Sequence, residues 1–384
     1  MKTFKSALAF AVSVALLLSL CTAVSAATVI NYGDYGYAAN GDGTYMLYKY
    51  NGSEKNLALP SELLELPVVG IYDNCFKNSD IESVTIPNTY LSIGKSAFYG
   101  CSSLSSITIP DSVGEIGEMA FADCGELGSV LFSGTPTLKS IPYAAFKGDA
   151  KLSAVTIPES VTSVNSYAFS ETGLLSITVP DSVKSVGSYA FSGCTSLMSA
   201  VLSSALTEVE DYTFSNCSAL ETVSLPSGLI TIGDRAFSGC TSLTDVDLPA
   251  ALQSIGKYAF YNAAALNELF IPDSVTSIGE EALSPMGHSN TLTVSYYKDS
   301  YAQTYCYENY IQKVSAYTKL MGDVNLDGKV NIRDATYIQM YLAKLIEKLS
   351  YRSLELADVT GEGSVSIRDA TMIQMFLVGL INEL

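Results

Sequence analysis

A phenylalanine returns at an almost constant interval through the middle of the chain, and this periodicity limits the fold more than any other feature. The intervals are 22, 23, 25, 23, 22, 23, 23 and 23 residues, for Phe76, Phe98, Phe121, Phe146, Phe169, Phe191, Phe214, Phe237 and Phe260. Leu283 holds the next place in the series. A unit this short cannot bury its own apolar face, so the units must stack into a solenoid.

Each unit contains one clear strand signal. In "LTDVDLPAALQSIGKYAF" (243–260), apolar residues alternate and then stop at a proline, which cannot donate to a further ladder. We expect short parallel strands joined by irregular or short helical returns, an α/β solenoid. With strands about 4.8 Å apart, some ten units form a rod of roughly 45–50 Å.

The units follow the pattern I-P-x-x-V-x-x-I-G-x-x-A-F-x-x-C, and "DSYAQTYCYENY" (299–310) has the character of a closing cap. This pattern resembles the BspA-like class of bacterial leucine-rich-repeat proteins. The resemblance implies an N-terminal flanking segment at 27–56, a leucine-rich-repeat solenoid at 57–290 and a C-terminal cap at 291–318. It also implies a recognition or display role, although a fold alone does not name the ligand.

The first residues predict export. Lys2 and Lys5 precede an apolar run over 7–20, and the small residues of "AVSAA" follow it, which is typical of a signal peptide over 1–26 cleaved after Ala26. No later segment reaches the roughly 18–20 apolar residues that cross a bilayer. We therefore expect a secreted, extracellular protein without a membrane span.

Charge and composition exclude several functions. A net charge of −18 argues against nucleic-acid binding, which needs a concentrated positive field. His288 is the single histidine, placed in a loop-like context, and there is no tryptophan. Histidine-based nucleophilic catalysis and His-rich metal sites therefore lack material, and we predict a protein that is not an enzyme.

Five cysteines share one place in the repeat, three residues after the phenylalanine: Cys101, Cys124, Cys194, Cys217 and Cys240. Asp149, Thr172 and Ala263 hold that place in other units, so it suits small side chains. Stacking brings neighbouring Cα atoms within disulfide range. The parallel side chains and the odd number of cysteines left after cleavage favour buried thiols over disulfides.

Strand residues between the inward apolar ones must point to the opposite face, which we call the concave face. It is mostly small hydroxyl side chains, as in Ser83/Thr85 and Ser106/Thr108, and these are also good strand residues for an ordinary solvated sheet, the interpretation that we favour for most of this face. Four residues near its C-terminal end break the pattern and are candidate ligand contacts: Asp245, Asp247, Glu268 and Phe270.

A second candidate surface, the tyrosine stripe, lies two residues before the repeat phenylalanine. Its members are Tyr167, Tyr189, Tyr212 and Tyr258, with Arg235 in the gap. Stacked units would align these rings, either as a platform for sugars or a partner protein, or as a ladder that stiffens the rod.

Two loops near the C-terminus have the spacing of calcium ligands. Oxygen donors at positions 1, 3, 5, 7 and 12 suit Ca²⁺, with position 7 using its backbone carbonyl. The first loop offers Asp323, Asn325, Asp327, Lys329 and Asp334; the second offers Asp358, Thr360, Glu362, Ser364 and Asp369. Thr360 replaces an Asn or Asp, and Glu362 is one methylene longer than Asp, so we expect weaker binding in the second loop.

Each loop opens a nearly identical helix, "IRDATYIQM" and then "IRDATMIQM", 35 residues apart. The duplication resembles a type I dockerin over 320–384, which implies two calcium ions and docking to a cohesin on a cellulosome-type scaffoldin. By that resemblance the cohesin contacts are Ile332, Arg333, Gln339, Met340, Ile367, Arg368, Gln374 and Met375. The two quartets are identical, so docking in two orientations is expected; the alternative for the Ile and Met residues is core packing.

Together these features favour a non-catalytic binding or adhesion protein, held on a scaffold by its dockerin, whose repeat arm recognises a protein or a polysaccharide. One alternative is a scaffold-borne carbohydrate-active enzyme, since glycosidases need paired carboxylates across a cleft. Asp245, Asp247 and Glu268 are the carboxylates available for that chemistry, on a face expected to be open. The other alternative is a calcium-dependent assembly module with a non-cohesin partner.

Overall fold

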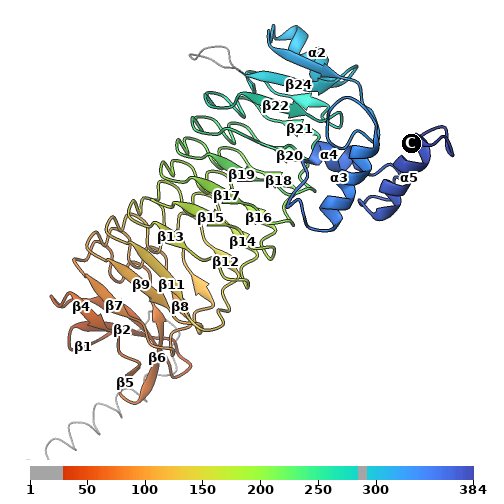
Figure 1. Ribbon diagram of the computed structural model, residues 1–384. Helices are drawn as coiled ribbons and strands as arrows, with labels where there is room; N and C mark the ends of the chain where they lie inside the picture. The colour runs from red at the N-terminus through yellow and green to blue at the C-terminus, as the bar shows by residue number, and fades with distance from the viewer. Residues whose placement is uncertain (1–28, 284–291) are drawn as a thin grey trace, which may run out of the picture.

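The computed structural model describes residues 29–283 and 292–384. The predicted signal peptide and His288 lie outside the described residues. Stacked coils form an elongated rod, and a group of helices lies beside its C-terminal end (Figure 1).

Most complete coils contribute two short parallel strands, which form two ladders along the rod. The first ladder carries the predicted strands: β4 (Asn56–Ala58), β7 (Ser83–Thr85), β9 (Ser106–Ile109), β11 (Ser129–Phe132), β13 (Ala154–Val155), β15 (Ser176–Thr178), β17 (Ser199–Val201), β19 (Thr222–Ser224) and β22 (Glu268–Ile271). Between β19 and β22 the ladder continues only as a bridge from Thr222 to Asp245. β13 and β15 belong to different sheets, so the first ladder is interrupted there.

The second ladder lies in the returns and was not predicted. It consists of β6 (Leu66–Ile71), β8 (Ser92–Ile93), β10 (Glu115–Ile116), β12 (Ser140–Ile141), β14 (Ser163–Val164), β16 (Ser185–Val186), β18 (Glu208–Val209), β20 (Thr231–Ile232), β21 (Ser254–Ile255) and β23 (Ser277–Ile278). The rest of each return is turns, and residues 57–283 contain no helix. Of the two kinds of return that we expected, the irregular one is present, and stacked Ser-Val and Ser-Ile pairs within it find parallel partners in the adjacent coils.

A close approach between coils explains the glycine after many of these pairs. A Cβ on Gly117 would lie 2.3 Å from the backbone nitrogen of Lys95 in the coil before. Only glycine fits such a contact without moving the neighbouring backbone.

Additional elements cover both ends of the rod. At the N-terminal end, β1 (Val29–Tyr32), β2 (Tyr35–Ala39) and β3 (Tyr45–Tyr50) form an antiparallel sheet that joins β6, which also pairs with β5 (Glu62–Leu63). At the other end, β24 (Thr293–Tyr297) and β25 (Val314–Tyr317) extend the sheet of β22 in parallel. Helix α2 (Tyr301–Glu308) packs beside β24.

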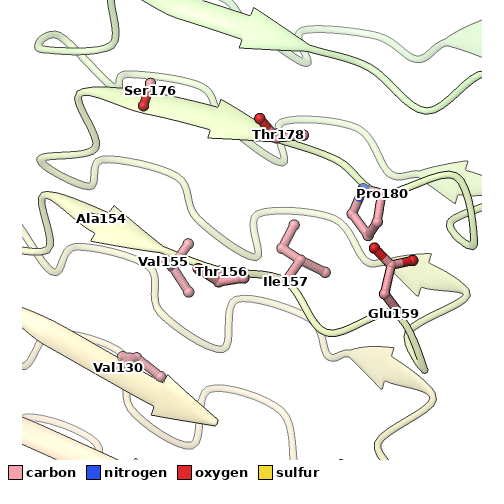
Figure 2. Close-up of a pocket in the computed structure, with 9 residues that line it drawn as sticks. All are labelled: Val130, Ala154, Val155, Thr156, Ile157, Glu159, Ser176, Thr178 and Pro180. Atoms are coloured by element: carbon pink, nitrogen blue, oxygen red, sulfur yellow. The ribbon is translucent and has the colours of Figure 1, made fainter.

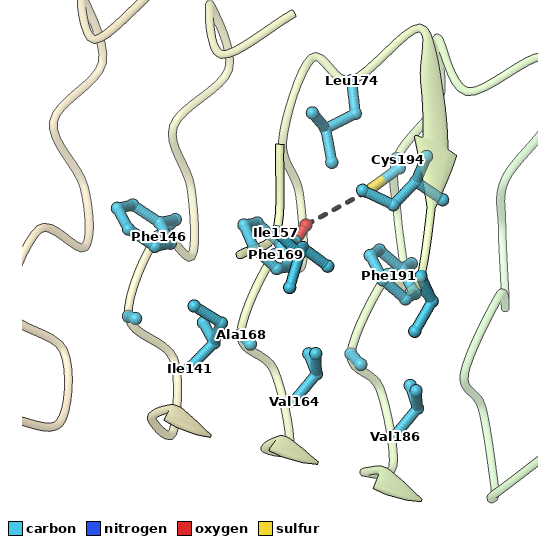
Figure 3. Close-up of a cluster of buried hydrophobic side chains, with 14 of the residues drawn as sticks. Ile141, Phe146, Ile157, Val164, Ala168, Phe169, Leu174, Val186, Phe191 and Cys194 are labelled. Atoms are coloured by element: carbon cyan, nitrogen blue, oxygen red, sulfur yellow. Dashed lines mark hydrogen bonds between the residues drawn. The ribbon is translucent and has the colours of Figure 1, made fainter. Parts of the chain in front are cut away.

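The repeat phenylalanines form one continuous stack inside the rod. Neighbouring rings from Phe76 to Phe260 have centroids 5.0–5.7 Å apart and planes within 10° of parallel. Figure 3 shows Phe146, Phe169 and Phe191 in this arrangement above Val164 and Val186. Burying these rings supplies much of the energy that orders each coil, because a buried aromatic removes a large apolar area from water.

The cysteines are free thiols buried inside the rod, as predicted. All seven in the described residues are buried and free. Cys194 is typical: its Sγ donates to the carbonyl of Phe169 at 3.1 Å (Figure 3). The shared slot thus gives a small side chain a backbone acceptor in the coil before.

The C-terminal module, residues 320–384, has three helices: α3 (Ile332–Leu342), α4 (Tyr351–Ala357) and α5 (Ile367–Leu377). They enclose a small core that is separate from the core of the rod and includes Val324, Ala335, Ile338, Leu349, Ala357, Ala370 and Ile373. In the described part of the chain, every helix is too short or too polar to cross a membrane.

Candidate functional site

The first calcium-type loop is organised by two of its carboxylates. Asp323 accepts hydrogen bonds from the backbone nitrogens of Asp327 at 3.0 Å and Gly328 at 2.9 Å. Asp334 is fully buried and accepts from the backbone nitrogens of Val324, Asn325 and Asn331 at 2.9–3.1 Å. One side chain therefore ties together the start and the end of the loop.

The local sequence explains why this loop turns back on itself. Leu326 and Gly328 adopt left-handed backbone angles, with φ of 62° and 79°, which glycine accepts without strain. Asn331 then caps α3: its side chain accepts from the backbone of Arg333, while Asp334 accepts from the backbone of Asn331. This reciprocal capping box fixes Asp334 at position 12 of the loop.

The second loop repeats this frame with different contacts. Asp369 is buried and accepts from both the backbone and side chain of Thr360, at 3.0 and 2.8 Å, and from Ser366. Burial raises the pKa of Asp369, but these hydrogen bonds outweigh it and hold that pKa below its ordinary value. The carboxylate of Asp369 therefore already has hydrogen-bond donors from within its own loop.

Glu362, the predicted calcium ligand at position 5 of the second loop, has side-chain partners near the start of α5. Its carboxylate contacts the guanidinium of Arg368 at 2.9 Å and accepts from the hydroxyl of Ser366 at 3.0 Å. No ion pair involves Arg333, the equivalent arginine after the first loop, within 29–283 and 292–384. The two loops thus differ in the contacts of this arginine: Arg368 is held by Glu362, and Arg333 has no such ion pair among the residues that the structure describes.

Both loops fit calcium by the chemistry of their donors. The side-chain donors are all oxygens, from Asp, Asn, Thr and Glu, which is what a hard divalent cation prefers. Within the described residues, no three His, Cys, Asp or Glu side chains converge closely enough to form a metal cluster. Each loop would have to complete its ligand set with Asn325 or Thr360 and with the carbonyls of Lys329 or Ser364.

We expect Glu362→Asp to tighten calcium binding in the second loop by about tenfold, or ~1.4 kcal/mol. The shorter side chain cannot hold Arg368 in the same way and matches Asp327 at position 5 of the first loop. Titration calorimetry on the full chain measures both sites. The mirror exchange, Asp327→Glu, is the matched control and should weaken the first site; unchanged affinities in both variants would refute the length argument.

The eight predicted docking residues lie mainly on the surface of the C-terminal module. Ile332 and Ile367 are 56% and 58% exposed, and Arg333 and Arg368 are exposed as well. Met340 is 37% exposed, whereas Gln339, Gln374 and Met375 are half-buried. Core packing therefore does not explain the repeated isoleucines, and an Ile-Arg pair opens each of the helices α3 and α5.

The concave face has the predicted alternation, but its four unusual residues divide into two kinds. Asp245 and Glu268 are exposed. Asp247 accepts from the backbone nitrogen of Tyr351, and the ring of Phe270 lies 4.6 Å from the guanidinium carbon of Arg352. The latter two thus contact another part of the same chain.

Burial raises the pKa of Asp247, a shift that the Tyr351 hydrogen bond and the charge of Lys348 oppose and that Asp245 reinforces. Asp247 is thus held by neighbours in the C-terminal module, whereas Asp245 and Glu268 remain exposed.

A hollow of about 480 Å³ lies on the concave face where the first ladder is interrupted (Figure 2). Thr156 on one side and Ser176 and Thr178 of β15 on the other supply hydroxyls, with Val155 beneath and Glu159 at the rim. Sequence reasoning missed it, because the phenylalanine intervals that contain β13 and β15 are 23 and 22 residues, which is ordinary for this chain.

The tyrosine stripe is a stacked ladder. Tyr189 lies between Tyr167 and Tyr212, with ring centroids 4.6 and 4.4 Å away and nearly parallel planes. The guanidinium of Arg235 lies 5.9 Å from Tyr212 and 4.3 Å from Tyr258 and so continues the stack. The ring faces that would bind a sugar are therefore largely occupied by neighbouring side chains.

All five stripe residues also have φ between 56° and 61°, the left-handed region, which sequence reasoning did not reveal. Side chains other than glycine seldom adopt it. The position is part of the turn that carries the chain from the second strand to the repeat phenylalanine.

Two sequence families match the chain. The family described as BspA type leucine rich repeat region matches residues 69–198 and 184–312, in six copies. The family described as dockerin type I domain matches residues 321–378. No curated protein matches the chain.

Several solved structures are similar to the repeat part. A leucine-rich cell surface protein from Faecalibacterium prausnitzii is 25% identical, over 74% of this chain and 98% of that one, with a TM-score of 0.41. A leucine-rich-repeat protein from T. pallidum is 26% identical over 57% and 92%, with a TM-score of 0.43.

Proposed function

The chain belongs to the BspA-type leucine-rich-repeat family and carries a type I dockerin domain, and from this premise we propose that it is an extracellular binding protein attached to a cohesin-bearing scaffold. The combination of repeats with a dockerin supports a dockerin-mediated assembly or binding role. The dockerin would supply attachment, and the repeat arm would supply recognition.

The observation that carries this proposal is the pair of exposed Ile-Arg corners at the start of α3 and α5. Ile332 and Ile367 are 56% and 58% exposed at equivalent places in the two duplicated segments, so packing in the core of the module does not account for their repetition. Each isoleucine is followed by an arginine, a residue favoured in interface contacts. The calcium loops place both corners, since Asp334 and Asp369 cap the same helices.

We expect calcium-dependent binding of the full chain to type I cohesin modules of scaffold proteins encoded by the same genome. Because the two corners have the same residues, Arg333→Ala or Arg368→Ala alone should change the affinity little. The double variant should lose about 3 kcal/mol, more than a hundredfold. Surface plasmon resonance with calcium and then with chelator measures this.

Lys344→Ala, an exposed change after α3, is the control and should bind like the parent chain. Binding that persists in chelator, or a double variant that binds as well as the single ones, would contradict the proposed docking mode. Calcium binding without any cohesin affinity would instead favour an assembly module with a different partner.

For the repeat arm we propose a ligand on the concave face ahead of Asp247, either a protein or a polysaccharide. The hollow at β13 and β15 supports this choice because it combines hydroxyls with an apolar floor. The stripe offers mainly ring edges and hydroxyls, since its faces are stacked. Both matched families are non-catalytic modules, so a binding role accounts for the chain better than a carbohydrate-active enzyme does.

A further inference from the structure

We infer that the C-terminal end of the concave face is a docking site for the chain's own dockerin, which holds repeat arm and dockerin as one rigid unit. The segment 348–355, with α4 at its centre, lies against the last coils of the rod. This inference goes beyond cohesin binding, and it does not depend on it.

Arg352 is the centre of the contact. Its guanidinium carbon lies 3.9 Å from the ring centroid of Tyr317, 4.6 Å from Phe270 and 5.6 Å from Tyr297. Phe270 belongs to β22, and the two tyrosines belong to β24 and β25. Three rings from three neighbouring strands of one sheet thus enclose a cation from the dockerin, an arrangement that is strongest when water is excluded.

Polar contacts surround this centre. The backbone nitrogen of Tyr351 donates to both carboxylate oxygens of Asp247, at 3.2 and 3.0 Å, and the Tyr351 hydroxyl donates to the carbonyl of Leu225. Lys319, just ahead of the dockerin, bridges Asp273 of the rod and Glu355 of α4. Several separate contacts therefore fix α4 against the rod, so changing the conformation of one side chain would not release the helix.

The repeat sequence changes where the contact lies. The concave position of Asp247 and Phe270 holds a small hydroxyl residue in five other coils (Thr85, Thr108, Thr156, Thr178 and Ser224) and an aliphatic residue in two (Leu131 and Val201). Those coils contact no part of the dockerin through that position among the described residues, except where Leu225 follows Ser224. A carboxylate and an aromatic ring replace the small hydroxyls in the two coils that face Tyr351 and Arg352, which is what a built contact requires.

The two parts still fold around separate cores, so the interface is not a continuation of either one. It remains partly open: a gap of about 440 Å³ lies between Asp245, Glu268, Leu326 and Lys348. While α4 is docked, Ile332 and Ile367 stay exposed. A cohesin bound there would therefore take a fixed direction relative to the rod.

A single-tryptophan reporter tests this in the full chain, which has no tryptophan of its own. Tyr317→Trp keeps an aromatic face for Arg352, because tryptophan is the best ring for a cation. In the docked chain its emission should be blue-shifted and poorly quenched by acrylamide. Arg352→Glu on the dockerin side and Asp247→Lys on the rod side should each raise quenching severalfold.

Lys344→Glu is the charge-matched control: it lies on the exposed surface of the dockerin and should leave quenching unchanged. A calcium titration of every variant verifies that the dockerin is still folded. The inference is overturned if the reporter is readily quenched in the parent chain. It is equally overturned if Asp247→Lys has no effect, because a response to Arg352→Glu alone would then be local damage within the dockerin.

Discussion

Asp334→Ala is expected to unfold the dockerin of the intact chain and to abolish its calcium-dependent binding, while the repeat rod stays folded. The substitution removes the acceptor for three backbone N–H groups, those of Val324, Asn325 and Asn331. Each orphaned buried group costs about 1–3 kcal/mol. A core of this size supplies only about 3–5 kcal/mol, so the loss exceeds the margin.

Calcium would deepen the effect, because the same carboxylate is the predicted ligand at position 12 of the first loop. Thermal unfolding by circular dichroism should retain the transition of the rod and lose that of the dockerin. Asp334→Asn is the matched control: it keeps an acceptor oxygen but loses the charge, so it should fold at high calcium and bind the metal more weakly. Wild-type calcium stoichiometry in Asp334→Ala would show that position 12 is not essential.

The rod could be predicted in outline because its repeat signal is one-dimensional. The spacing of the phenylalanines, the alternation before each proline and the small slot of the cysteines each depend on a single coil and its neighbour, and stacking multiplies them. The second ladder escaped prediction because a two-residue strand has no alternation to detect. Ser163 and Val164 become a strand only when Ser140, Ile141, Ser185 and Val186 are already beside them.

The candidate sites were harder to predict, since contacts between distant segments decide their state. Asp247 and Phe270 stand out in the sequence as breaks in a monotonous face, and that much is visible without a structure. Their partners, Tyr351 and Arg352, are roughly 80 to 100 residues away in the chain, and no pattern in the repeat points to them. Glu362 is similar, for its length is visible in the sequence but its contact with Arg368 is not.

Asp149 shows that the residue most common at a repeat position does not predict the properties of every coil. It occupies the slot of the buried cysteines and is completely buried itself. One carboxylate oxygen accepts from the backbone nitrogen of Cys124 at 2.8 Å, and the other has no hydrogen-bond partner in the described part of the chain. Burial raises the pKa of Asp149 well above its ordinary value, with the charge of Asp123 adding to the rise and the Cys124 bond opposing it.

This carboxyl should make the rod less stable as pH rises. In the unfolded chain it ionises near its ordinary pKa of about 3.9. Above that pH the folded rod still holds the proton, so folding binds a proton and the free energy of unfolding falls by up to ~1.4 kcal/mol per pH unit. The fall continues until pH passes the raised pKa of the folded state, above which the buried carboxylate is charged.

Asp149→Cys should therefore stabilise the rod, by an amount that grows with pH over that window. Cysteine fits the slot in five other coils, and the Cys124 nitrogen can then donate to the carbonyl of Phe121, as Cys101 does to Phe98. Asp149→Asn should flatten the pH dependence too but gain less, since its amide leaves a buried donor unpaired. Denaturant unfolding of the rod from pH 4 to 9, with reductant and constant calcium, measures the difference. The exposed change Asp80→Ala removes the same charge and should leave the pH dependence of the unfolding free energy as it is. An identical pH dependence in the parent chain and both Asp149 variants would contradict the prediction. It would mean that the Asp149 carboxyl is already ionised, with a cation or a water as its missing partner.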